Sequence, residues 1–162
     1  MRIFPPETVT GTIPLEMTRT MSGLEVFAEM LAGRLPPPPI ARTMNMSLHR
    51  AEHGVAEFRG VPLAEYFNPL GTVHGGWAAT ILDSALGCAV HTILPAGVAY
   101  TTIEFKVNLV RPISDRTGEV ICIGKVIHAG RTTAVSEASL TDAAGKLLAF
   151  GTETCAVFPL RE

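Results

Sequence analysis

The feature that most limits the fold of this sequence is an almost uninterrupted apolar run over residues 78–90. Its side chains would cover nearly the whole circumference of a helix, so we expect a helix that is buried on most sides. Pro95 and Gly97 predict the end of this helix near Leu94. A helix without a polar face has to be surrounded by other elements of the chain.

Segments in which apolar and polar residues alternate flank the predicted helix. Residues 44–49 and 55–60, separated by a short turn that contains Gly54, predict a hairpin. Four further strands are predicted at residues 99–111, 118–128, 132–141 and 146–158, with turn signals between them. Together these elements predict an α+β fold in which a curved antiparallel sheet wraps the long central helix.

The strand predicted at residues 99–111 alternates well, and we expect one of its sides to face the core. That side carries Thr101, Ile103, Phe105, Val107 and Leu109. The opposite side carries Thr102, Glu104, Lys106 and Asn108.

The N-terminal part of the chain has weaker signals. Residues 1–20 show no periodicity and predict an extended or partly disordered arm, from which we expect little function. Ser22 is a predicted N-cap for a short amphipathic helix over residues 23–31. The four prolines at 36–39 favour a stiff polyproline segment that leads into the first strand. We therefore predict an N-terminal arm, residues 1–39, and a main domain, residues 40–162.

Composition narrows the class of protein. The 162 residues suffice for one domain, and 47% hydrophobic residues with a mean hydropathy of +0.30 point to oligomer interfaces. The net charge is −2 and the basic residues are scattered, which gives no support for nucleic-acid binding. No signal peptide or membrane-spanning run is visible, so we expect a cytoplasmic protein without a membrane partner. The three cysteines lack the spacing of a metal site or a redox motif.

The start of the central helix is a candidate binding site. His74, Gly75 and Gly76 follow turn residues, and the glycine pair marks the predicted helix start. The first N–H groups of a helix have no internal partner and lie at the positive end of its dipole. With no side chains in the way, Gly75 and Gly76 could therefore bind a carbonyl oxygen or an oxyanion.

Asp83 is the one acid within the apolar run. Burying a carboxylate without partners costs several kcal/mol in practice, or else forces its protonation. Asp83 is therefore either a functional acid, or a residue that faces a wet gap or caps a neighbouring loop.

The spacing along the helix adds a further inference. Asp83 lies eight residues after Gly75, which corresponds to roughly 12 Å along a helix. One small reacting group cannot contact both. If both act in one reaction they must come from different chains, so we predict active sites shared across a symmetric homodimer.

Several short motifs, in order and at their spacing, resemble one family. They are Asn68-x-x-Gly71-x-x-His74-Gly75-Gly76 followed by Asp83, then Asn108-x-x-Arg111-Pro112, Gly130-Arg131 and Asp142-x-x-Gly145. Over residues 40–158 the chain resembles the hotdog-fold acyl-CoA thioesterases, and among them the phenylacetic acid degradation (PaaI-like) group. The resemblance implies hydrolysis of a coenzyme A thioester without a cofactor or a bound metal, by a homodimer or a homotetramer.

The resemblance also implies roles for individual residues. Asp83 would be the general base or the nucleophile, and the N–H of Gly75 would polarise the thioester carbonyl. Asn68 and His74 would lie close by, His74 as a positioning residue. The hydroxyl that holds water or the carboxylate would be that of Thr102, with Thr101 as the alternative.

Other choices stay open at this stage. Gly76 is a further candidate for substrate binding, and Arg111 and Arg131 could contact the phosphates of coenzyme A or simply be solvated strand ends. Trp77, like Tyr66 and Phe67, could either line an aromatic or medium-chain acyl pocket or pack in the core. The alternatives to a thioesterase are a non-catalytic acyl-CoA-binding protein and a hotdog dehydratase or hydratase.

Overall fold

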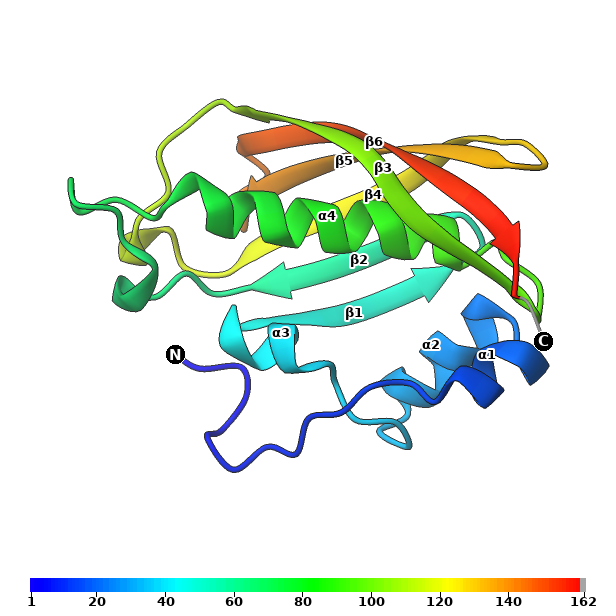
Figure 1. Ribbon diagram of the computed structural model, residues 1–162. Helices are drawn as coiled ribbons and strands as arrows, with labels where there is room; N and C mark the ends of the chain where they lie inside the picture. Colours follow the sequence, from blue (N-terminus) through cyan, green and yellow to red (C-terminus); the bar gives the residue numbers. More distant parts are fainter. Residues whose placement is uncertain (161–162) are drawn as a thin grey trace.

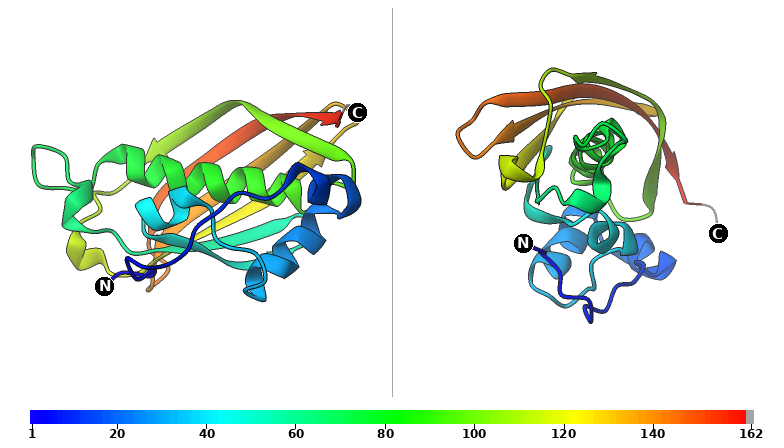
Figure 2. Two further views of the ribbon diagram at one scale, coloured as in Figure 1. Left: turned by 60° about the horizontal axis from the view of Figure 1, so that its bottom comes forward. Right: turned by 90° about the vertical axis from the view of Figure 1, so that its left-hand side faces the viewer.

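A computed structural model describes residues 1–160 of the protein. The helix α4 (Gly75–His91) lies in the concave face of a six-stranded antiparallel sheet, which curls around it (Figures 1 and 2). This confirms the predicted α+β architecture. The strands are β1 (Met46–Glu52), β2 (Val55–Gly60), β3 (Val98–Leu109), β4 (Val120–Ala129), β5 (Thr133–Asp142) and β6 (Leu147–Pro159).

The strand order, β1-β2-β4-β5-β6-β3, leaves β1 and β3 at the two edges of the sheet. Two single-turn 3₁₀ helices, Ala64–Tyr66 and Asp115–Thr117, lie in the connections beside the start of α4 and the end of β3. Within residues 1–160 no helix is both long and apolar enough to cross a bilayer.

The core forms where α4 meets the sheet, and the helix is buried around most of its circumference, as predicted. Its buried residues are Trp77, Ala78, Ile81, Leu82, Ala85, Leu86, Gly87, Ala89 and Val90. The sheet comes so close at Gly124 that a Cβ there would lie 2.1 Å from the carbonyl oxygen of Ala85. Glycine at this position therefore lets the helix backbone rest directly on β4.

The predicted core face of the strand now labelled β3 is only partly correct. Phe105, Val107 and Leu109 pair with residues 153, 151 and 149 of β6, and they share the inner face with them. A register shift between Thr102 and Glu104 leaves Ile103 without a partner, and this side chain is 63% exposed.

A bulge of this kind inverts the alternation, because the extra residue moves every preceding side chain to the other face. Thr102 lies opposite the fully buried Cys155, so it shares the inner face of the sheet. Thr101 lies opposite Ala156, on the outer face. The assignment of Thr101 to the core side was therefore wrong.

The N-terminal residues are not an extended or disordered arm. They include α1 (Leu15–Thr20) and α2 (Gly23–Leu31), which lie near the end of α4, and α3 (Pro39–Thr43), which lies beside the start of β1 (Figure 1). The Ser22 N-cap is confirmed, with a reciprocal capping box to Glu25. The polyproline segment does not lead directly into β1, because Pro39 begins α3 at the first helical position, where proline is tolerated. The division of the chain at residue 39 stays a prediction.

Candidate active site

Two cavities lie along α4, and the predicted site residues divide between them. The larger has a volume of about 890 Å³, and Asp83 and Thr102 are in its wall. The smaller, of about 320 Å³, is lined by Asn68, Gly75 and Arg111. Within one chain, the helix start and the helical acid therefore belong to separate cavities, as their spacing predicted.

His74 is the N-cap of α4, and its Nδ1 accepts the N–H of Gly76 at 2.9 Å. The donor at Gly76 is thus already used, which corrects the prediction that both glycine N–H groups are free. An imidazole that accepts at Nδ1 carries its proton on Nε2. The N–H of Gly75 has no acceptor among residues 1–160. One free donor therefore remains at the positive end of the helix dipole.

Asn68 lies beside this donor and also holds its own loop together. Its Oδ1 accepts the N–H groups of Leu70 and Thr72 at 2.9 and 3.3 Å, and its Nδ2 donates to Thr72 Oγ1 at 2.8 Å. An amide nitrogen has two hydrogens, so one is left for another acceptor. The predicted neighbourhood of Asn68 and Gly75 is therefore present, although most of the amide serves the loop.

Asp83 is half-buried in the wall of the larger cavity, and no hydrogen bond or ion pair to it is found within residues 1–160. This carboxylate does not cap a neighbouring loop. Its burial raises its pKa above the usual aspartate range. A carboxylate with a raised pKa is a better proton acceptor than an exposed one, which suits a general base.

Thr102 faces the same cavity, and its Oγ1 lies 2.8 Å from Oε1 of Glu153. Glu153 is fully buried and also accepts from Cys155 Sγ at 3.0 Å, while its Oε2 has no partner among residues 1–160. The sequence analysis missed this acid. One signal for it was visible in the sequence. Residues 151, 153 and 155 alternate onto the same face of the strand, and Gly151 and Cys155 mark this face as the one toward the core.

The two candidate arginines lie at opposite ends of the sheet. Arg111 donates from Nη1 to the carbonyl of Leu147, at the start of β6. Arg131 is exposed in the turn between β4 and β5, where Thr132 pairs with Val157 near the end of β6. About nine residues of extended strand separate these ends, or about 30 Å. One chain cannot bring both guanidinium groups to the same phosphate.

The aromatic residues near the helix start pack in the core. Trp77 is 2% exposed, donates its indole N–H to the carbonyl of Met44 at 2.8 Å, and stacks on Tyr66. Phe67 also packs against the core. Of the two readings left open above, core packing is therefore the correct one. His91, by contrast, lines the larger cavity and packs between the rings of Phe27 and Tyr100.

Comparisons with known proteins agree with this arrangement. The sequence profile of the thioesterase superfamily matches residues 70–149. A candidate esterase of Halobacterium salinarum is 42% identical over 72 residues, which are 43% of this chain and 46% of that protein. The chain thus matches less than half the length of this curated relative.

Two solved structures extend the similarity to most of the chain. A conserved protein of Pseudomonas aeruginosa is 32% identical, with a TM-score of 0.69 and coverage of 74% of this chain and 94% of that one. A candidate thioesterase of Ralstonia eutropha, described as related to phenylacetic acid degradation, is 27% identical. Its TM-score is 0.73, and the match covers 80% of this chain and 98% of that one.

Proposed function

Since the chain belongs to the thioesterase superfamily and has the hotdog fold of its PaaI-like members, we propose that it hydrolyses acyl-CoA thioesters to the free acid and coenzyme A. The observation that carries this proposal is Asp83, a carboxylate without partners among residues 1–160, in the wall of a large cavity that Thr102 also lines. The free N–H of Gly75 supplies the second component, a donor for the thioester carbonyl.

The proposed enzyme is a homodimer that joins two sheets through β3. This strand is a free edge of twelve residues, and exposed apolar side chains follow it, with Ile103 63%, Phe105 38% and Leu109 58% exposed. Long apolar edges favour pairing with another strand. A second copy of β3, running antiparallel across a two-fold axis, would cover both edges at once.

Such an axis between Phe105 and Lys106 of β3 would also complete the active site, because antiparallel pairing would then place Thr102 opposite the partner's Leu109. Gly75 packs closely on Leu109 within one chain, where an added Cβ would lie 2.6 Å from Cδ1 of Leu109. The partner's Gly75 would therefore approach Thr102 and Asp83. The same rotation would bring the partner's Arg111 toward Arg131, where the two could contact the phosphates of coenzyme A. A homotetramer would join two such dimers.

In the proposed mechanism, the partner's Gly75 N–H binds the thioester oxygen and stabilises the negative charge that develops on it. Asp83 removes a proton from the attacking water, or attacks the carbonyl itself. Thr102 holds the water or the carboxylate in place. His74 fixes the helix start through its bond to Gly76 and leaves its Nε2–H free. The coenzyme A thiolate then departs, which leaves the free acid in the first case and an acyl–aspartyl anhydride, still to be hydrolysed by water, in the second.

The test is a panel of acyl-CoAs, from acetyl- to hexadecanoyl-CoA and phenylacetyl-CoA, assayed by release of the free thiol. We expect turnover of at least one member that rises in proportion to protein concentration. Tight binding of an acyl-CoA without thiol release would instead favour the non-catalytic binding protein, and hydration of an enoyl-CoA would favour the hydratase.

A further inference from the structure

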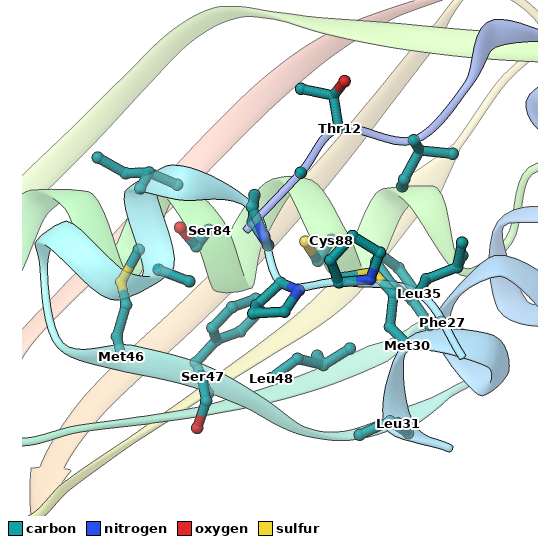
Figure 3. Close-up of a pocket in the computed structure, with 18 of the residues that line it drawn as sticks. Thr12, Phe27, Met30, Leu31, Leu35, Met46, Ser47, Leu48, Ser84 and Cys88 are labelled. Atoms are coloured by element: carbon teal, nitrogen blue, oxygen red, sulfur yellow. The ribbon is translucent and has the colours of Figure 1, made fainter. Parts of the chain in front are cut away.

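The N-terminal residues build one whole wall of the larger cavity. Figure 3 shows side chains of α2, of the segment after it and of the chain near Thr12 facing side chains of β1 and α4. The apolar residues in this wall include Phe4, Val9, Ile13, Phe27, Met30, Leu31, Leu35 and Ile40. The predicted arm without function is thus the part of the chain that encloses the space above Asp83.

Hydrogen bonds hold this wall against the rest of the molecule. Gly11 N–H donates to Pro37 O at 3.0 Å, which joins the N-terminal segment to the proline run. Ile3 N–H donates to Asn45 Oδ1 at 2.6 Å, and Gly97 N–H donates to Thr18 O at 2.9 Å. The wall is therefore attached both beside β1 and beside β3.

The cavity is more polar on one side than on the other. Most of its polar side chains come from α4, β1 and β3, among them Asp83, His91 and Thr102, whereas the N-terminal side is hydrocarbon apart from Thr12 and Arg34. The cation in that side, Arg34, is bound to both carboxylate oxygens of Glu29, at 2.5 and 2.7 Å. An acidic acyl group would find no free counter-ion there.

Resting on the proposed function, we propose that this cavity holds the acyl group of the thioester and that the substrates are CoA esters of uncharged, medium- to long-chain aliphatic acids. The reacting carbon would lie at Asp83 and the chain would extend toward α2 and the proline segment. A volume of about 890 Å³ is near the upper end for small-molecule pockets. Each buried methylene strengthens binding about fourfold, so chain length should govern kcat/KM.

The experiment compares Met30→Trp with Ala28→Trp over a series of saturated acyl-CoAs. Both substitutions add the same ring to α2, but Met30 lines the cavity whereas Ala28 is exposed and does not. We expect Met30→Trp to lower the ratio of kcat/KM for dodecanoyl-CoA to that for acetyl-CoA at least tenfold. Ala28→Trp should leave the ratio unchanged. Leu35→Trp, from another part of the wall, repeats the test if Met30→Trp does not fold.

A ratio that is the same in all variants, or a wild type that prefers succinyl-CoA, would overturn the acyl assignment while leaving the proposed function intact. If the wild type hydrolyses no acyl-CoA, the proposed function fails instead. Calorimetric titration with dodecanoic acid then tests separately whether the cavity holds an acyl chain. Binding that is weakened by Met30→Trp and unchanged by Ala28→Trp supports the acyl assignment, and a lack of binding overturns it.

A second inference comes independently from the buried acid Glu153. Its Oε1 is shared by the Thr102 hydroxyl and the Cys155 thiol, and its Oε2 is orphaned in the interior. An unpaired buried oxygen is far more costly on a charged carboxylate than on a neutral acid. Burial accordingly raises the pKa of Glu153, against the smaller lowering effect of the hydrogen bonds from Cys155 and Thr102, and the charge of Asp83 adds to the rise.

We infer that Glu153 is a positioning residue whose proton sets the direction of the Thr102 hydroxyl. Neutral Glu153 donates from Oε1 to Thr102 Oγ1, so the threonine hydrogen is free to point at Asp83 or at the water. Ionised Glu153 accepts that hydrogen instead and turns it away from the cavity. This inference also rests on the proposed function, because Thr102 acts through the thioesterase site.

The charged and titratable groups around Glu153 are few. They are Asp83 and Cys88 on α4, Tyr100 on β3 and Cys155 on β6. Burial raises the pKa of Cys88 to about 12 and raises those of Tyr100 and Cys155 as well. These three groups stay neutral between pH 5 and 9. His91 on α4 also packs against Tyr100 and lines the cavity, and its burial lowers its pKa. Asp83 and Glu153 are the two acids of this group, and the pKa of each is raised.

The test is the pH profile of Glu153→Gln. Glutamine can still donate to Thr102 but cannot ionise. Wild-type kcat/KM should rise as Asp83 deprotonates and fall as the pH passes the raised pKa of Glu153, and Glu153→Gln should lose only the basic limb. The infrared band of the protonated Glu153 carboxyl can be identified by its absence in Glu153→Gln. In the wild type this band should disappear over the same pH range as the basic limb of kcat/KM. Superimposable profiles, or a band absent at neutral pH, would overturn the inference, whereas a lack of all turnover would count against the proposed function.

Discussion

Asp83→Asn is expected to lower kcat for acyl-CoA hydrolysis by about 10²- to 10⁴-fold, the usual contribution of a general base, and by more if the carboxylate is the nucleophile. Asparagine has nearly the same shape but cannot accept the proton of water. Because Asp83 is half-buried without a partner, the substitution also removes a desolvation cost. The melting temperature should therefore stay the same or rise, which separates a catalytic effect from unfolding.

Asp115→Asn is the matched control, since Asp115 is exposed in a 3₁₀ turn and lines neither cavity. It should leave kcat unchanged. A single turnover in ¹⁸O-labelled water then assigns the role of Asp83. An anhydride that is hydrolysed at the aspartyl carbon would give unlabelled acid and place the label in Asp83, whereas a general base would give labelled acid and leave Asp83 unlabelled. Wild-type turnover by Asp83→Asn would rule out both roles.

The architecture could be read from the sequence because burial leaves a periodic pattern. The helix over residues 78–90 is apolar on most sides, and a sheet is the simplest element that can wrap it. Which side chains of β3 face the core could not be predicted in the same way. A bulge at Ile103 depends on how β3 pairs with a strand some fifty residues later, and the alternation within β3 carries no trace of that pairing.

The site was predictable to a similar extent. Gly75 was unusual as a glycine at the start of an apolar helix, and Asp83 as an acid within it. Their spacing alone implied that an active site using both must draw them from two chains. Glu153 and the N-terminal wall were missed for a common reason. Both depend on contacts between distant segments, Glu153 with Thr102 and the N-terminal segment with residues 36–40, α2, β1 and α4. The lack of periodicity in residues 1–20 was mistaken for a lack of structure, although hydrogen bonds to Asn45 and Pro37 hold this segment.

Gly75→Pro is expected to lower kcat about 10²- to 10³-fold, the usual cost of losing an oxyanion donor. Proline removes the N–H and is well tolerated at the first position of a helix. The preceding His74 has a ψ of 137°, which is the conformation that a residue before proline prefers. Gly75→Ala is the control, because it adds a Cβ against the flexible end of Leu109 but keeps the N–H. It should retain most of the activity.

Coexpression of Gly75→Pro and Asp83→Asn chains then tests whether each site is shared. Each mixed dimer would have one site with both defects and one with neither. Random assembly in equal amounts makes half of the dimers mixed, so about a quarter of wild-type activity should return. A site built within one chain would carry a defect in every subunit, and no activity would return. Recovery therefore requires that the helix start of one chain serve the carboxylate of the other, which is what the two separate cavities along α4 imply.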